Sequence, residues 1–212
     1  MFSALLSYPT SEMRAALDEM AGLIERSPLI APAERPGLLA LIASLGEGDL
    51  LDAEERYCEL FDRGRALSLH LFEHLHGESR DRGTAMVELK QLYRAAGFDL
   101  VGNELPDYLP VVLEYLSCRE LPEARDMLVD CAHILRVIAR ALIARQSDYA
   151  AVLQALLVIA GEQPVDVAKV PPAKERIEDL DRAWREEPAF GGDPQAAARP
   201  PAPARGGRHA ME

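Results

Sequence analysis

Apolar residues recur at intervals of three and four between Leu121 and Leu142, and this spacing is the strongest constraint on the fold of the chain. Residues three and four positions apart lie on the same face of an α-helix, so the run predicts one long helix that packs along one side. Pro122 fits the first turn of this helix, where a missing backbone N–H breaks no hydrogen bond. The apolar–polar alternation of β-strands is hardly present in the sequence. We therefore expect an all-α fold with this helix at its centre.

Shorter segments with the same spacing are bounded by helix start and stop signals. Capping side chains precede several of them, and proline or glycine ends most of them. The expected helices run from Thr10 or Ser11 to Pro28, from Leu38 to Leu45, from Asp49 through Phe61, along Leu67, Leu71 and Leu75 to Gly77, from an Asp81 cap to Gly97, through Leu113 and Leu116, and from an Asp148 cap to Gly161. With the central helix, the sequence predicts about eight helices.

The composition changes after residue 160 and divides the chain. We expect residues 1–160 to form a single helical-bundle domain and residues 161–173 to form a linker. Residues 174–187 are expected to form a charged helix with an apolar strip of only three side chains. Proline, alanine, glycine and arginine dominate residues 188–212, which is typical of a disordered tail.

The chain is acidic, with 35 aspartates and glutamates against 23 lysines and arginines and a formal net charge of -12. Proteins that bind nucleic acid present a basic surface to the phosphates, so this charge argues against a nucleic-acid partner. The charge instead favours a basic partner, such as a short cationic protein segment.

No targeting or membrane-spanning segment is expected. The N-terminus lacks the basic residues that open a signal peptide. The most apolar later stretch, Tyr149 to Ala160, is shorter than the roughly 20 residues that cross a bilayer. Cys58, Cys118 and Cys131 form no C-x-x-C pair, which predicts neither a disulfide framework nor a thiolate zinc site. We expect a cytoplasmic protein with no direct membrane insertion.

The segment His70-Leu-Phe-Glu-His74 fits the H-x-x-E-H pattern. Histidines at i and i+4 lie on one helix face and can share a zinc ion, with the glutamate as general base. One hypothesis is therefore a zinc-dependent hydrolase that uses His70, Glu73 and His74. Its third ligand would have to be an acidic residue elsewhere, namely Glu104, Asp107 or Glu114. Peptidases with this motif are larger and contain sheets, so the alternative is that the imidazoles bond to neighbouring carboxylates or carbonyls.

Two further segments carry candidate binding residues. Arg80 and Arg82 lie at a predicted helix N-terminus, where they could hold an anion, or could instead pair with Glu73 or Glu78. The proline-rich segment from Glu104 to Pro110 leads into a helix that carries Glu114 and Tyr115. Carboxylates and aromatics here could rim a groove for an amphipathic basic peptide. The alternative is a turn in which Asp107 caps the following helix.

In their order, these segments resemble the nitrate reductase delta subunit family. Its members are molybdenum cofactor assembly chaperones related to the TorD/DmsD redox-enzyme maturation chaperones. The resemblance covers about residues 6 to 190 and rests on several blocks in sequence, which is more specific than any single motif. The matching blocks are Glu59-Leu-Phe-Asp-Arg63, Ser68-Leu-His-Leu-Phe-Glu-His74, Gly77-Glu-Ser-Arg-Asp-Arg-Gly83, Ala85-Met86, Glu104-Leu-Pro-Asp-Tyr-Leu-Pro110, Leu113-Glu-Tyr-Leu116 and Ala183-Trp-Arg-Glu-Glu-Pro188.

The resemblance implies a TorD-like all-helical domain and a monomeric chaperone that is not an enzyme and has no cofactor of its own. Its implied partner is the catalytic alpha subunit of membrane-bound respiratory nitrate reductase, bound through a basic N-terminal segment. The chaperone would hold the apoenzyme while the molybdenum cofactor and an iron–sulfur cluster are inserted, before docking on the membrane subunit. An adaptor for another folded partner is the alternative.

The expected partner-binding residues come from these blocks. They are Phe61, Arg63, His70, Phe72, Glu73, His74, Arg80, Arg82, Glu104, Pro106, Asp107, Tyr108, Glu114 and Tyr115.

Overall fold

The computed structural model describes residues 1–62, 64–76 and 80–173. Arg63, the predicted helix 174–187 and the predicted tail 188–212 lie outside the described residues, as does the side chain of Arg80. Residues 1–173 form one compact unit.

The described residues are helical, with one isolated antiparallel bridge between His70 and Tyr108, so the prediction of an all-α fold is confirmed. There are ten α-helices and two short 3₁₀-helices among them, against the eight or so expected. The α-helices are α1 (Phe2–Leu6), α2 (Ser11–Ala15), α3 (Leu17–Arg26), α4 (Arg35–Gly46), α5 (Leu50–Phe61), α6 (Leu71–His76), α7 (Arg80–Ala95), α8 (Leu109–Ser117), α9 (Leu121–Ala144) and α10 (Ala150–Ile159), and the 3₁₀-helices are η1 (Arg65–Leu67) and η2 (Val167–Lys169).

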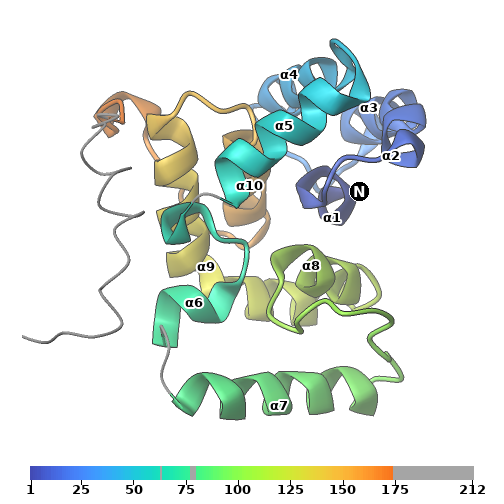
Figure 1. The fold of residues 1–212 in the computed structure, drawn as a ribbon, viewed down its shortest axis with the longest axis vertical. Helices are drawn as coiled ribbons and strands as arrows, with labels where there is room; N and C mark the ends of the chain where they lie inside the picture. Colours follow the sequence, from blue (N-terminus) through green and yellow to red (C-terminus); the bar gives the residue numbers. More distant parts are fainter. Residues whose placement is uncertain (63, 77–79, 174–212) are drawn as a thin grey trace, which may run out of the picture. The chain divides into compact units, whose positions relative to one another are not determined.

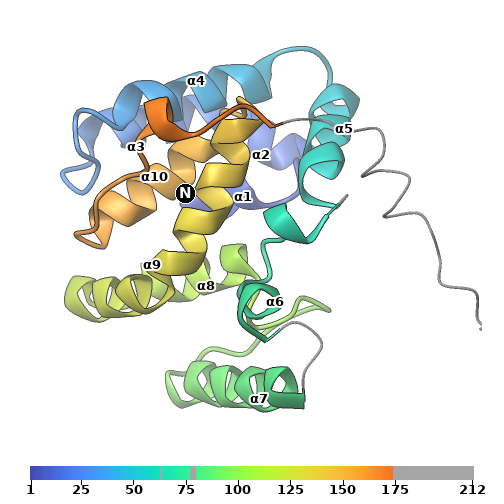
Figure 2. The ribbon, with the colours of Figure 1, turned by 90° about the vertical axis from the view of Figure 1, so that its left-hand side faces the viewer.

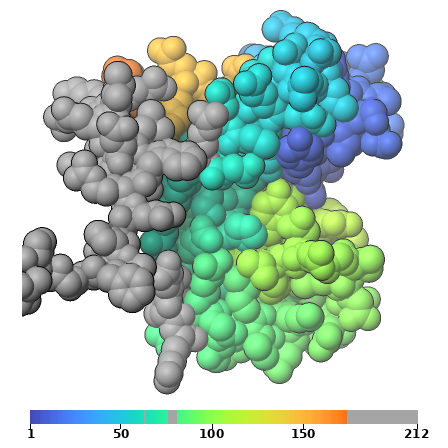
Figure 3. Space-filling view, viewed as in Figure 1, coloured from blue at the N-terminus to red at the C-terminus, as the bar shows by residue number. Residues whose placement is uncertain are grey.

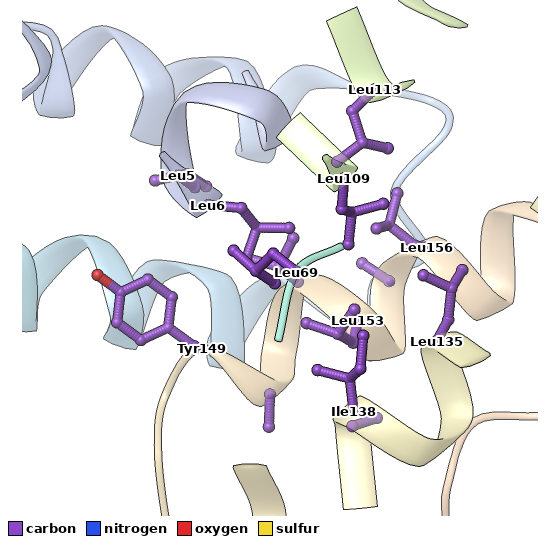
Figure 4. Packing of buried hydrophobic residues seen from close by; sticks show 14 of the residues in the cluster. Leu5, Leu6, Leu69, Leu109, Leu113, Leu135, Ile138, Tyr149, Leu153 and Leu156 are labelled. Atoms are coloured by element: carbon purple, nitrogen blue, oxygen red, sulfur yellow. The ribbon is translucent and has the colours of Figure 1, made fainter. Parts of the chain in front are cut away.

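The long predicted helix is α9, which lies at the centre and begins with Pro122 in its first turn. Helix α10 packs along it, and α1 packs on α8. Both ribbon views place α4 at one end of this unit and α7 at the other, with α8 and α9 between them (Figures 1 and 2). Fully buried side chains from α1, α8, α9 and α10 meet in the core (Figure 4). Those labelled there include Leu6, Leu109, Ile138 and Leu153.

Several local signals act as expected. The Thr10 side chain accepts a hydrogen bond from the Met13 N–H and caps α2. Asp49 and Asp52 form a capping box at the start of α5. The predicted first helix is nevertheless broken at Ala16 into α2 and α3, because Ala16 adopts φ −93° and ψ 0° and its N–H bonds to the Met13 carbonyl as in a 3₁₀ turn.

Three helix predictions are wrong. Leu67, Leu71 and Leu75 do not share one helix: the chain leaves η1, runs extended through the bridge at His70 and only then enters α6, so that Leu75 is exposed. Asp81 lies in the first turn of α7 rather than at its cap. Asp148 does not cap α10 with its side chain, because backbone carbonyls of Ser147 and Asp148 already accept from the first N–H groups.

The segment expected to be a linker, 161–173, is held against the helices. The Gln154 side chain donates to the Val165 carbonyl at 2.7 Å and accepts from the Val165 N–H at 2.8 Å. Val165 is buried, and the Ala173 N–H donates to the Ala144 carbonyl at the end of α9.

Candidate functional site

Two neighbouring hollows lie along α8, and α1 forms the opposite wall. They share Ser3, Ser7, Tyr8 and Glu114, so together they form one groove. In the space-filling view, the dark blue N-terminal atoms lie beside the yellow-green atoms of the α8 region (Figure 3). The two hollows have volumes of about 670 Å³ and about 420 Å³, which is the range that accepts several side chains of a ligand.

The larger hollow, here called the apolar pocket, lies beside the C-terminal half of α8. Most of its lining is aliphatic, aromatic or methionine, and it includes one carboxylate and one guanidinium. Its apolar side chains are those of Met1, Phe2, Ala4, Met13, Leu29, Leu113, Leu116, Leu121, Ala124, Leu128, Leu156 and Ile159, and its charged side chains are those of Glu114 and Arg119. Such a surface binds apolar side chains, and its two methionines can adjust to their shape.

The smaller hollow, here called the acidic pocket, lies beside the N-terminal half of α8. Three carboxylates line it, from Asp99, Glu104 and Glu114, while no lysine or arginine is among its lining residues. All three of these residues are exposed. The other lining side chains are mainly aromatic or aliphatic: Tyr8, Tyr93, Phe98, Leu100, Val101, Tyr108, Pro110, Val111 and Tyr115, with Ser3 and Ser7.

Hydrogen-bonded tyrosines hold the wall of the acidic pocket in place. The Tyr93 hydroxyl donates to the Pro106 carbonyl at 2.8 Å, and the Tyr93 and Tyr115 ring centroids are 4.6 Å apart. The Tyr57 hydroxyl donates to the Leu6 carbonyl at 2.9 Å, which leaves the Tyr108 hydroxyl to donate to Tyr57, also at 2.9 Å. Burial raises the pKa of Tyr57, Tyr93 and Tyr108 above the usual tyrosine value, so their hydroxyls keep their protons. This network links α5 to α1 and α8.

Asp107 joins two of the predicted blocks, Ser68 to His74 and Glu104 to Pro110, which are far apart in the sequence. Its side chain is fully buried, and its carboxylate accepts from the Phe72 N–H at 3.0 Å and from Nδ1 of His70 at 3.3 Å. Its backbone carbonyl accepts from the Leu71 N–H, and the Leu109 N–H donates to the Leu69 carbonyl. Asp107 therefore stabilises the N-terminus of α6, and the alternative in which it caps the following helix is wrong. The N-cap of α8 is Tyr108, without a side-chain hydrogen bond.

His70 lies at the edge of this junction. The hydrogen bond with Asp107 is the main cause that raises the pKa of His70, and it outweighs the opposing effect of partial burial. The imidazole also lies 5.1 Å from the Tyr108 ring, measured between centroids. A protonated His70 therefore strengthens the contact between α6 and the segment before α8.

The other predicted site residues of α6 and α7 also bond within the chain. His74 donates from Nε2 to the Ser68 carbonyl at 2.9 Å, and Arg82 forms a salt bridge with Glu73 at 3.2 Å. Burial acts to raise the pKa of Glu73, but the hydrogen bond with Ser68 and the Arg82 charge together lower it below the usual value. Within residues 1–62, 64–76 and 80–173, no three His, Cys, Asp or Glu side chains are grouped as a metal site requires. The two histidines of the H-x-x-E-H pattern bond to different partners.

The structure sorts the predicted site residues into groups. One group lines the groove: Glu104, Tyr108, Glu114 and Tyr115. A second group, Pro106 and Asp107, is buried and lines neither pocket. A third group lies in or next to α6 and α7 and is here called the α6–α7 cluster: His70, Phe72, Glu73, His74 and Arg82. Phe61 is 8% exposed and packs against the rings of Tyr57 and Tyr149 in the core. The binding roles of all these residues stay predictions.

No local sequence pattern predicted the opposite wall of the groove. Met1, Phe2 and Tyr8 line it from α1 and the segment after α1, and Phe98 closes the acidic pocket from the loop after α7. The 46% exposed Tyr8 could have been noticed as an aromatic between short helices, but nothing local shows that it faces α8.

Comparison with known proteins finds a matching family model and several relatives. The family model described as nitrate reductase delta subunit matches residues 11–155, a range that includes α8 and begins after α1. Two of the relatives come from Escherichia coli K12. The nitrate reductase molybdenum cofactor assembly chaperone NarJ is 42% identical over 191 residues, which cover 87% of this chain and 80% of the relative. The probable nitrate reductase molybdenum cofactor assembly chaperone NarW is 39% identical over 188 residues, covering 86% and 78%.

A more distant relative comes from Bacillus subtilis strain 168. It is a probable nitrate reductase molybdenum cofactor assembly chaperone NarJ, 33% identical over 155 residues, which cover 73% of this chain and 83% of the relative.

Among the described residues, no helix is both long and apolar enough to cross a membrane.

Proposed function

Because this chain belongs to the nitrate reductase delta subunit family, we propose that it is a molybdenum cofactor assembly chaperone that binds an immature nitrate reductase through the groove between α1 and α8. The relatives are named as assembly chaperones, and the chain is not an enzyme. Its client is the catalytic alpha subunit, and the bound element is the basic N-terminal segment of that subunit. As a cytoplasmic monomer, the chaperone holds the apoenzyme while molybdenum cofactor and an iron–sulfur cluster are inserted, before docking to the membrane subunit.

The observation that carries this proposal is the combination of chemistry in one groove. An amphipathic segment has an apolar face and charged residues beside it, and it needs both kinds of surface to bind. The apolar pocket supplies the first, and the carboxylates of Asp99, Glu104 and Glu114 supply the second. The net charge of -12 attracts a cationic segment over a longer distance and speeds its association.

Apolar contacts in the groove supply part of the binding strength. Enclosing two or three apolar side chains at about 1.5–3 kcal/mol each supplies about 3–9 kcal/mol before the cost of ordering the segment, and charge pairs with the carboxylates and other contacts supply the rest of an affinity that we expect to lie between micromolar and nanomolar. This corresponds to about -8 to -12 kcal/mol, which a chaperone can release once its client has folded.

Calorimetric titration of the full chain with a peptide of the client N-terminus tests the proposal. We expect binding that weakens as salt rises, because exposed carboxylates are screened. Ser7→Trp, placed where the two pockets meet, should block the groove and weaken binding at least about tenfold, which is the equivalent of about 1.4 kcal/mol. Ser11→Trp is the matched control, because Ser11 is exposed and lines neither pocket.

Unchanged affinity of the Ser7→Trp variant, with a circular dichroism spectrum like that of the parent, would show that the client binds elsewhere. Loss of binding in both tryptophan variants would likewise argue against a specific role of the groove. If only a different folded protein were retained in a pull-down from cells making nitrate reductase, the chain would be an adaptor instead.

A further inference from the structure

The charge of the groove changes along α8. Among the described residues, the acidic pocket is lined by three carboxylates and by no lysine or arginine, although Arg94 reaches Asp99 from outside the lining at 3.7 Å, whereas both Glu114 and Arg119 line the apolar pocket. Glu114 lies at the boundary and faces both. A ligand that occupies the whole groove therefore meets a negative end and a mainly apolar end that holds one carboxylate and one guanidinium.

Aromatic side chains line the acidic pocket together with the carboxylates. Tyr93 and Tyr115 are buried, at 1% and 2% exposed, so the rings that a ligand can reach are those of Tyr8, Phe98 and Tyr108. The face of an aromatic ring attracts cations, and the attraction increases when water is excluded. The Tyr108 hydroxyl is already hydrogen-bonded to the Tyr57 hydroxyl, so a ligand meets the ring of Tyr108 and the carboxylates rather than a free hydroxyl.

One ring of this wall already contacts a cation within the chain. The central guanidinium carbon of Arg119 lies 5.1 Å from the centroid of the Tyr115 ring. Arg119 approaches from the apolar pocket, which it lines, and it is absent from the lining of the acidic pocket. On the acidic side Asp99 pairs with Arg94 at 3.7 Å, while the described lining holds no lysine or arginine beside Glu104 and Glu114.

We infer that the groove has two subsites, which bind one segment of the client together. This inference rests on the proposed function. The acidic pocket binds a cationic side chain through aromatic faces and the carboxylates of Glu104 and Glu114. The apolar pocket binds a large apolar side chain of the same segment. Val111 in the first pocket and Ser117 in the second are six positions apart on α8, which is about 9 Å at 1.5 Å per residue. The two client side chains are then about six residues apart in a helix, or about three in an extended segment.

A double-mutant cycle tests this assignment. Each arginine of the client peptide is replaced in turn by citrulline, which has nearly the same shape without the charge, and each peptide is titrated into the parent chain and into the Glu104→Gln/Glu114→Gln variant. Both glutamates are exposed, so the variant should fold normally. Glu55→Gln on α5 is the control, because Glu55 is exposed and lines neither pocket.

We expect one arginine position at which citrulline weakens binding to the parent and to Glu55→Gln about tenfold, as for one partly enclosed cation–aromatic contact with a carboxylate. In the double variant the same replacement should have less than about twofold effect, since the interacting carboxylates are gone. Equal effects on both proteins, or no effect on either, would overturn the two-subsite assignment while leaving client binding intact.

A small probe separates this inference from the proposed function. N-acetyl-arginine methylamide is added to the isotope-labelled full chain, and amide resonances are followed by NMR, with the citrulline analogue as control. Shifts for residues of the acidic pocket with the arginine probe alone support the cation subsite, even if the client peptide does not bind. The absence of such shifts, or equal shifts with citrulline, overturns it.

Discussion

Replacing Asp107 should destabilise the fold more than any other loss of a single charge in the described residues. The Asp107 carboxylate is fully buried and accepts from the Phe72 N–H at 3.0 Å and from His70 at 3.3 Å. In Asp107→Ala both donors lose the carboxylate that accepts from them, namely Nδ1 of His70 and the Phe72 N–H at the start of α6. We therefore expect the contact between α6 and the segment before α8 to loosen.

The magnitude follows from these two hydrogen bonds. A hydrogen bond to a charged group contributes about 1.5–3 kcal/mol net. The His70 side chain is 29% exposed, which places its bond at the low end because water screens it. Asp107→Ala should lower the free energy of unfolding by about 3–5 kcal/mol, whereas Asp107→Asn, which keeps one acceptor for Phe72, should lower it by about 1–2 kcal/mol.

The loss should depend on pH in one direction. The pKa of His70 is raised above its ordinary value of about 6.5, so its extra stabilisation is complete below that pH and is lost as pH rises through the raised value. The difference in unfolding free energy between the parent and Asp107→Ala should therefore be larger near pH 6 than near pH 8.5. A neutral His70 can still donate to Asp107, so part of the difference remains at the higher pH.

Urea unfolding followed by circular dichroism measures both effects, and an unchanged m-value shows that the two-state comparison holds. Asp126→Asn is the control, because Asp126 is exposed on α9, and it should change stability by less than about 0.5 kcal/mol. A cost below about 1 kcal/mol for Asp107→Ala, or a difference that grows as pH rises, would refute the reasoning about the buried carboxylate.

Three further changes test the packing and the caps. Gln154→Leu removes both hydrogen bonds to Val165 and should lower the free energy of unfolding by about 2–4 kcal/mol in urea, while an effect below about 0.5 kcal/mol would mean that segment 161–173 is not held there. Ile138→Ala empties a fully buried position of α9 and should cost about 2–5 kcal/mol, with the exposed Val137→Ala as a control that should cost under about 1 kcal/mol. Asp49→Ala breaks the capping box of α5 and should cost about 0.5–2 kcal/mol, whereas the exposed Glu55→Ala should be nearly neutral; equal effects would contradict the capping role.

Local sequence signals were sufficient for most helices. The spacing from Leu121 to Leu142 predicted α9, Thr10 and Asp49 predicted the starts of α2 and α5, and Gly97 with its φ of 79° marks the end of α7. These signals act within one or two helical turns, where periodicity and capping are decided by the neighbouring residues alone. Acidic composition likewise needs no structure, and it led directly to the expectation of a basic partner.

The groove and the α6–α8 junction depend on contacts between distant parts of the chain. Local rules favour Asp107 as a helix cap, but packing buries it against residues 37 and 35 positions earlier, where its carboxylate accepts from the His70 side chain and from the Phe72 N–H. Tyr8 and Glu114 line the same groove although more than a hundred residues separate them. Side-chain spacing reports only which face of a helix is apolar, and several partner helices can cover such a face. Which helices come together, and where they leave a hollow, is therefore set by the packing of the whole domain.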